Sequence, residues 1–229
     1  MGAENKNQDQ TLDTENLKKE TVETVNQVKE TIKNVDIKND AKEATGFVTS
    51  MFKDPFATIK TIADDSTNKA FKTAIIFLII WVAAEFLDSA LSIALSRFWT
   101  INWGSKMLGL IKTVIAPVLS VLALSITVYL MNKKSKKSLM TTISSITVAK
   151  IPVVLASVVS LLTLISSNAS PLTSRFSSFC SAISIVLTYF SVKALFGEEQ
   201  NSKFIKKFVI IYAIYYVISL VLYYLGIYI

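Results

Sequence analysis

The sequence predicts an all-α membrane protein, a polytopic bundle of five transmembrane helices that follows a charged arm and short amphipathic helices. Of the 229 residues, 52% are hydrophobic, and the mean hydropathy is +0.47. Apolar runs of about 20 residues with few charges are long enough to cross a bilayer as helices. Five such runs are present, at residues 74–95, 108–131, 139–165, 177–196 and 208–229.

The order of polar and apolar segments predicts three regions. Residues 1–46 form a polar arm, partly helical and partly disordered, residues 47–70 form interfacial amphipathic helices, and residues 71–229 form the transmembrane domain. Residues 1–70 hold 10 basic and 13 acidic side chains, whereas the rest of the chain holds 14 basic and 4 acidic ones. The net positive charge therefore belongs to loops beside the membrane, and we expect no nucleic-acid partner.

The basic residues of the loops predict how the chain is oriented in the membrane. One side receives nine of them: Lys69, Lys72, Lys133, Lys134, Lys136, Lys137, Lys203, Lys206 and Lys207. The other side receives Arg97, Lys106 and Arg175. Because short cytoplasmic loops are enriched in Lys and Arg, we expect a multi-pass protein of the cell membrane with its N-terminus in the cytoplasm and its C-terminus outside.

The arm carries a weak helical signal. Residues 1–16 are polar, and we expect them to be disordered because they offer little apolar surface to bury. From Leu17 onward, Val25, Val28, Ile32 and Val35 follow a helical spacing. This stripe predicts either a helix that is solvated or lies on a surface, or one that self-associates. Homo-oligomers, or contacts with other membrane proteins through the arm, are the partners we expect besides the lipid bilayer.

Gly46 is expected to break the chain before two short one-sided segments. Asp54-Pro55 predicts a helix N-cap followed by proline at the first helical position. Phe52 and Phe56 belong to the apolar faces on either side of this turn. We interpret both segments as helices that lie in the headgroup region, and packing of the same faces on the membrane domain is the alternative.

The third apolar run contains a lysine and a proline, Lys150 and Pro152. Lys150 lies 13 residues beyond Lys137, or about 20 Å at 1.5 Å per residue. Glu85 lies at the same distance beyond Lys72, and Asp88 is one turn further on. The matching depths predict a Glu85–Lys150 ion pair, and Pro152 predicts a kink. These charges either dock two helices on each other or line a hydrated path for an ion or proton.

Other polar residues of the spans receive simpler interpretations. Lys112 lies near the end of a span and is expected to reach water. Tyr212, Tyr215 and Tyr216, in the last span, are interpreted as packing groups, and a cage for a cation is the alternative. The run formed by Lys133, Lys134, Lys136 and Lys137 is a topology signal that could also face anionic lipid.

No motif in the sequence predicts catalysis. The chain has no His and a single Cys, and it contains no glycine-rich phosphate loop and no nucleophile with a neighbouring base. Glu85 and Asp88 are two acids without a third ligand, which makes a poor metal site. We therefore expect no catalytic residue, metal or cofactor.

The segment Met51-Phe52-Lys53-Asp54-Pro55-Phe56, the five spans and Ile151-Pro152 in the third span together resemble the bacterial branch of the Yip family. The eukaryotic members of that family are Rab-interacting proteins of the secretory pathway. The resemblance covers about residues 49–229 and implies a five-helix bundle that oligomerises and organises membranes. The Asp-Leu-Tyr-Gly-Pro motif of the eukaryotic members is absent, which argues against Rab binding.

Two functions are consistent with these observations. The first is a non-enzymatic integral membrane protein of Yip-like type that acts through association with partners or membrane organisation. The alternative is a small transporter or channel component with a polar intramembrane path at Glu85, Asp88 and Lys150.

Overall fold

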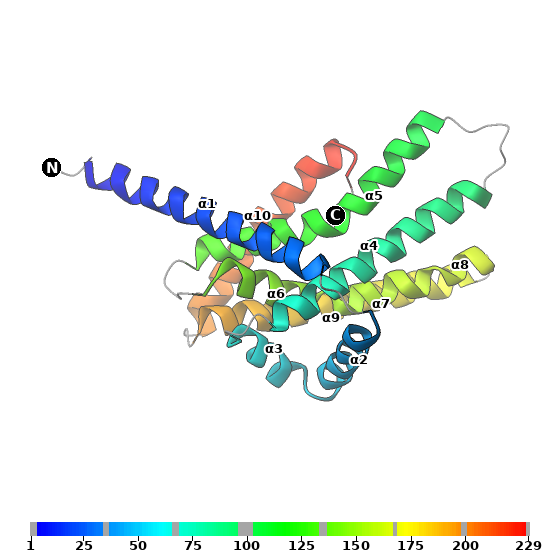
Figure 1. The fold of residues 1–229 in the computed structure, drawn as a ribbon, viewed down its shortest axis with the longest axis horizontal. Coiled ribbons are helices and arrows are strands. Elements are labelled where there is room, and N and C mark those ends of the chain that lie inside the picture. The colour runs from blue at the N-terminus through cyan, green and yellow to red at the C-terminus, as the bar shows by residue number, and fades with distance from the viewer. Residues whose placement is uncertain are drawn as a thin grey trace.

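The computed structural model describes residues 4–33, 37–65, 69–95, 103–132, 137–166, 169–197 and 201–227. Within these ranges the chain is helical and contains no strand (Figure 1), so the predicted all-α class is confirmed. In chain order the helices are α1 (Glu4–Lys33), α2 (Ile37–Lys53), α3 (Pro55–Ala63), α4 (Lys69–Leu95), α5 (Trp103–Met131), α6 (Leu139–Ala149), α7 (Ile151–Ser160), α8 (Leu162–Ile165), α9 (Ser170–Phe196) and α10 (Asn201–Tyr224).

Four of these helices, α4, α5, α9 and α10, are long and apolar enough to cross a membrane. A fifth span is formed if α6 is counted together with α7 and α8, which continue from it at an angle of 47°. The helices of the first, second, fourth and fifth predicted spans begin five to seven residues before the apolar runs that predicted them, because helical hydrogen bonding extends into the polar flanks. The third span begins where it was predicted.

α4 lies at the centre of the bundle and packs against α5, α6 and α7, while α9 packs on the other side of α6 and α7. Figure 1 shows α4 and the α7–α8 segment running side by side, away from α1. The core between α5, α6 and α9 consists of aliphatic side chains, among them Val121, Leu124, Ile146, Val192 and Leu195. We call the end where α4 and α6 begin the arm end, and the opposite end the far end.

The third span is broken at Lys150, between α6 and α7. Pro152 has no backbone N–H to donate to the carbonyl of Val148, so the helical ladder is interrupted at this point. The predicted kink is therefore present. Lys150 itself is helical in backbone conformation (φ −88°, ψ −2°), so the break bends the chain without reversing it.

α1 differs from the prediction over residues 4–16, which are helical and not disordered. These residues contain neither Gly nor Pro, and Glu, Lys and Gln favour helix even where there is little to bury. Further along α1, the Glu20 carboxylate accepts a hydrogen bond from the backbone N–H of Leu139, at the start of α6 (3.1 Å). Thr24 is buried and Val28 packs against the core, so α1 rests on the arm end.

α2 runs through Gly46 without interruption, so the expected break at this residue is wrong. A single glycine lowers helix stability by only about 1 kcal/mol, and the apolar residues that follow it contribute packing. Among these, Met51 is buried and Phe47 contacts the ring of Phe77 on α4 at 6.1 Å. The N-terminal region is therefore divided between α1 and α2 and not at Gly46.

α3 starts as predicted. The Asp54 side chain accepts a hydrogen bond from the backbone N–H of Ala57 (2.9 Å), and Pro55 is the first helical residue. Ile59 and Ile62 are buried where α3 packs on α6 and α9, whereas Phe52 and Phe56 are 70% and 51% exposed. The helix is thus packed on the bundle through one face and presents phenylalanine at its edge.

α10 lies at the periphery, next to α5, with most of its apolar surface exposed. Near the arm end it is held to α9 by edge-to-face aromatic contacts. The Tyr189 ring on α9 lies edge-on to Phe204 and Phe208 of α10, with centroids 5.2 and 5.0 Å away. Such edge-to-face pairs contribute about 0.5–1.5 kcal/mol each beyond the area they bury.

Candidate functional site at the far end

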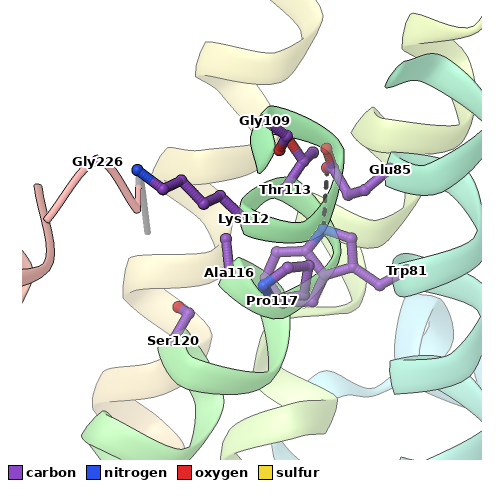
Figure 2. A pocket seen from close by; sticks show the side chains of 9 residues that line it. All are labelled: Trp81, Glu85, Gly109, Lys112, Thr113, Ala116, Pro117, Ser120 and Gly226. Carbon is purple, nitrogen blue, oxygen red and sulfur yellow. Dashed lines mark hydrogen bonds between the residues drawn. The ribbon is translucent and has the colours of Figure 1, made fainter. Parts of the chain in front are cut away.

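A cavity of about 330 Å³ opens between α4, α5 and the turn that follows α10 (Figure 2). We call it the far-end pocket. It is lined by Trp81, Glu85, Gly109, Lys112, Thr113, Ala116, Pro117, Ser120 and Gly226. The walls are mainly apolar, and one carboxylate, one ammonium group and two hydroxyl groups face the same space. A few polar groups in an apolar cavity are the usual composition of a small-molecule site.

The carboxylate of Glu85 is held in place by two hydrogen bonds to one of its oxygens. Ser157 of α7 donates its hydroxyl to Oε1 at 2.8 Å, and the indole N–H of Trp81 donates to the same atom at 3.3 Å. Trp81 stands one turn before Glu85 on α4, so the pair is local, whereas Ser157 comes from a different span. Among the described residues nothing donates to Oε2, so this atom is left for a further donor.

Lys112 turns toward the C-terminal end of α10. Its ammonium group donates to the carbonyl of Leu225 at 2.9 Å, and a positive charge there is favourable because helix C-termini are electronegative. Gly226 has a left-handed φ of +76°, and a Cβ atom at this residue would lie 2.4 Å from the lysine nitrogen. The left-handed turn therefore favours glycine, and a larger residue here would displace the flexible end of Lys112. The bond to Leu225 is a contact that the expectation of a water-reaching lysine did not include, and whether Lys112 also reaches water stays a prediction.

The predicted ion pair between Glu85 and Lys150 is not formed. The single ion pair found among the described residues whose side chains are placed joins Lys137 and Asp64. Glu85 lies 16 residues from the start of α4, whereas Lys150 lies only 11 residues from the start of α6. The prediction counted depth from Lys72 and Lys137, but Lys72 lies inside α4 and Lys137 lies before α6, so the two counts do not start at the same level. The neighbour of Glu85 is Ser157, two turns beyond Lys150.

Lys150 instead faces α10. Its ammonium nitrogen lies 5.9 Å from the centroid of the Tyr215 ring, within the range of a cation–π contact. The hydroxyl of Tyr215 is 2.9 Å from that of Ser120, which lines the far-end pocket. Tyr215 is thus more than a packing group, because polar contacts run from the pocket through Ser120 and Tyr215 to the lysine at the bend.

Asp88 does not join this group. It lies one turn beyond Glu85 on α4 but is absent from the lining of the far-end pocket, and no hydrogen bond or ion pair joins its side chain to a described residue. The residues predicted as one polar centre are therefore divided, with Glu85 in the pocket, Lys150 and Pro152 at the bend, and Asp88 apart from both.

The basic loop is only partly described, because Lys133, Lys134 and Lys136 lie outside the described residues. Lys137 donates to the carbonyl of Ala63 (2.7 Å) and to the carboxylate of Asp64 (2.9 Å), at the C-terminal end of α3. The charge of Lys137 thus interacts with a helix end of the same molecule and ties α3 to the beginning of the third span. The lipid-facing role of the basic loop stays a prediction.

Sequence reasoning did not find Trp81, Ser157 or Ser120 as members of the site. Trp81 could have been found, because it lies four residues before Glu85 and therefore on the same side of α4. Ser157 and Ser120 could not, since serine is common in these spans and only the packing of α4, α5 and α7 selects these two.

The fold and its apolar helices define a multi-span, all-α membrane protein. Comparisons of the chain with family models, with curated proteins and with solved structures give no match.

Proposed function

We propose that the chain is a non-enzymatic integral membrane protein that acts through association, binding a partner or the membrane surface with the helices at its arm end. In this proposal the arm end lies in the cytoplasm and the far end faces outside, as the basic loops predict. The transmembrane helices then serve as the anchor and α1, α2 and α3 as the binding layer.

The observation that carries the proposal is an exposed apolar stripe on α1. Val22, Val25 and Ile32 are 60%, 47% and 54% exposed. At 100° per residue they lie within about 80° of one another around the helix axis. The neighbouring face of α1, with Thr24 and Val28, already rests on the bundle. Because α1 is docked through this neighbouring face, the exposed stripe is held in a fixed position where a partner or the membrane surface can bind it.

A Yip-like character is part of the proposal. It is supported by the Asp54-Pro55 helix start, by the proline bend in the third span and by a count of spans that reaches five when the bent segments are joined. Yip-like proteins would be expected to associate with one another or with other membrane proteins, which agrees with the exposed stripe.

The proposal is tested by deleting residues 1–36, so that the cut falls between α1 and α2. The buried core residues come from α3 to α10, with only Val28 of α1 packed against them, so we expect the shortened protein to keep its helical content and thermal transition in detergent. Crosslinking followed by co-purification from native membranes should then recover fewer partners than the full chain does. A folded deletion variant that retains every partner of the full chain would overturn the proposal.

A second candidate, a small transporter or channel component, is favoured by one specific observation. The contacts from the far-end pocket through Ser120 and Tyr215 reach Lys150 in the middle of the third span. Intramembrane charges of this kind often mark ion or proton routes. Replacing Lys150 by Met should abolish flux in liposomes while the fold is retained. Wild-type protein without flux of protons, common cations or anions would rule this candidate out.

A further inference from the structure

We propose that the far-end pocket binds a small zwitterion, with the ligand's ammonium group against Glu85 and Trp81 and its anionic group toward Lys112. This inference is independent of the association function proposed above, because the pocket is built by α4, α5 and the end of α10 and not by α1 to α3.

The charges of the pocket favour a zwitterion over a simple ion. Its two ionisable side chains, Glu85 and Lys112, are of opposite sign, so the pocket as a whole is neutral. A cation alone would be attracted by Glu85 and repelled by Lys112, and an anion alone would meet the opposite pair of forces. A ligand that carries both charges can satisfy both side chains at once, and the apolar walls weaken the screening between them.

The ammonium end of the ligand has two partners on α4. Oε2 of Glu85 receives no hydrogen bond from a described residue and can accept one from an N–H group. The Trp81 indole lines the same cavity, and the face of a tryptophan ring is the strongest aromatic partner for a cation. Ser157 and Trp81 both hold the other carboxylate oxygen, so the acceptor is fixed before a ligand arrives.

The anionic end has a donor on α5. A lysine ammonium carries three N–H donors, and the carbonyl of Leu225 uses one of them. The hydroxyl of Thr113, one residue further along α5, lines the same space, but its proton is donated to the carbonyl of Gly109 at 3.0 Å, so Lys112 is the donor for the anionic end. Figure 2 shows Trp81 and Glu85 reaching in from α4, while Lys112 extends away from them toward Gly226. The two charged side chains therefore point in different directions from the pocket, and a ligand that carries both charges can bind between them.

The size and depth of the cavity limit the ligand to a small one. A volume of about 330 Å³ is at the lower end of the range for small-molecule pockets. Lys112 lies nine residues from the start of α5, about 13 Å below its far end. A free amine-phosphate or amino-acid-like molecule could enter from water, and the ethanolamine phosphate headgroup of a lipid could enter from the bilayer. Free ethanolamine phosphate and the lipid headgroup share an ammonium group joined to a phosphate through a two-carbon linker.

The test uses the fluorescence of Trp81 in the full chain, with Trp99 and Trp103 replaced by Phe. Ethanolamine phosphate, ethanolamine and propyl phosphate are titrated separately into protein in a detergent without charge. We expect the zwitterion to change the emission at concentrations at least tenfold lower than either ligand with a single type of charge. Equal responses to the zwitterion and to one of the other two ligands would overturn the proposal.

A second experiment with lipids distinguishes a soluble ligand from a lipid headgroup. The same protein is placed in nanodiscs of phosphatidylethanolamine or of phosphatidylglycerol, and retained lipid is identified by native mass spectrometry. A response to free ethanolamine phosphate supports a soluble ligand. A changed emission and retained lipid only with phosphatidylethanolamine support the headgroup as ligand. No response in detergent and no difference between the two bilayers would overturn the inference.

Matched variants locate the response. Glu85→Gln and Lys112→Met should each weaken the apparent affinity for ethanolamine phosphate by tenfold or more. Two control variants remove a negative and a positive charge outside the pocket lining. They are Asp88→Asn, one turn along α4, and Lys106→Met, at an exposed position of α5, and each should change the apparent affinity less than twofold. Equal losses from the pocket variants and these controls would contradict the assignment. If a pocket variant does not fold, the comparison of the three ligands with the wild-type pocket still tests whether the pocket prefers a zwitterion.

Discussion

At the scale of single residues, the structure shows how a partly buried carboxylate is accommodated without a basic partner. Glu85 is satisfied by a hydroxyl and an indole N–H, from Ser157 and Trp81. Hydrogen bonds to a charged acceptor contribute about 1.5–3 kcal/mol in soluble proteins. Between transmembrane helices the measured average is closer to 0.6 kcal/mol, with a maximum near 1.7. The membrane value is the appropriate one here, because Ser157 and Glu85 lie on different spans.

Replacing Ser157 by Ala should therefore lower the free energy of unfolding by about 1 kcal/mol. The measurement is reversible unfolding of the protein in mixed micelles with increasing SDS. Ser160→Ala is the matched control, because Ser160 donates only to the carbonyl of Ser157 within the same segment, and its loss should be the smaller one. A Ser157 variant as stable as the wild type would show that the bond to Glu85 contributes nothing.

Glu85 and Lys150 are predicted to be energetically independent. In a double-mutant cycle of Glu85→Gln and Lys150→Met, the separate losses in unfolding free energy should add to within about 0.5 kcal/mol. Ser120→Ala and Tyr215→Phe form the positive control, since their hydroxyls are 2.9 Å apart and their coupling should exceed that limit. A coupling above about 1 kcal/mol between Glu85 and Lys150 would mean that the two charges do interact.

At the scale of elements, the sequence predicts some features well because they depend only on neighbouring residues. The cap at Asp54 and the bend at Pro152 are of this kind, since each follows from the chemistry of one or two positions. The partner of Glu85 could not be predicted, because an offset of a few residues between two helices changes which side chain stands opposite. The contact of Lys112 with Leu225 likewise depends on where α10 ends beside α5.

Replacing Pro152 by Ala should straighten the third span, because the new backbone N–H can bond to the carbonyl of Val148. Spin labels are placed at Met140 and Ile165 in a protein in which Cys180 is replaced by Ser. At 1.5 Å per residue, opening the 47° bend should lengthen the distance between the two labelled positions by about 3 Å. Pulsed electron resonance measures this distance. Val153→Ala is the control and should leave it unchanged. An unaltered distance in the proline variant would show that packing against α9 imposes the bend.

At the scale of the whole molecule, the protein has two ends of different character. The arm end is covered by α1, α2 and α3, which carry the exposed residues Val22, Val25 and Phe52. The far end contains the pocket with its two opposite charges. Hydropathy predicts the spans and hence the class of protein. It does not predict the helicity of residues 4–16, which follows from the helix propensity of Glu, Lys and Gln, or the continuity of α2 through Gly46, which depends on the packing of α2.

The most direct test of the association function places a photo-crosslinking amino acid on α1 in living cells. At Val25 or Ile32, on the exposed stripe, we predict a defined crosslink to a partner protein or to lipid. At Glu23 or Glu30, which are exposed on another face of the same helix, we predict none. Crosslinks of equal strength from both faces, or none from Val25 and Ile32, would contradict the account.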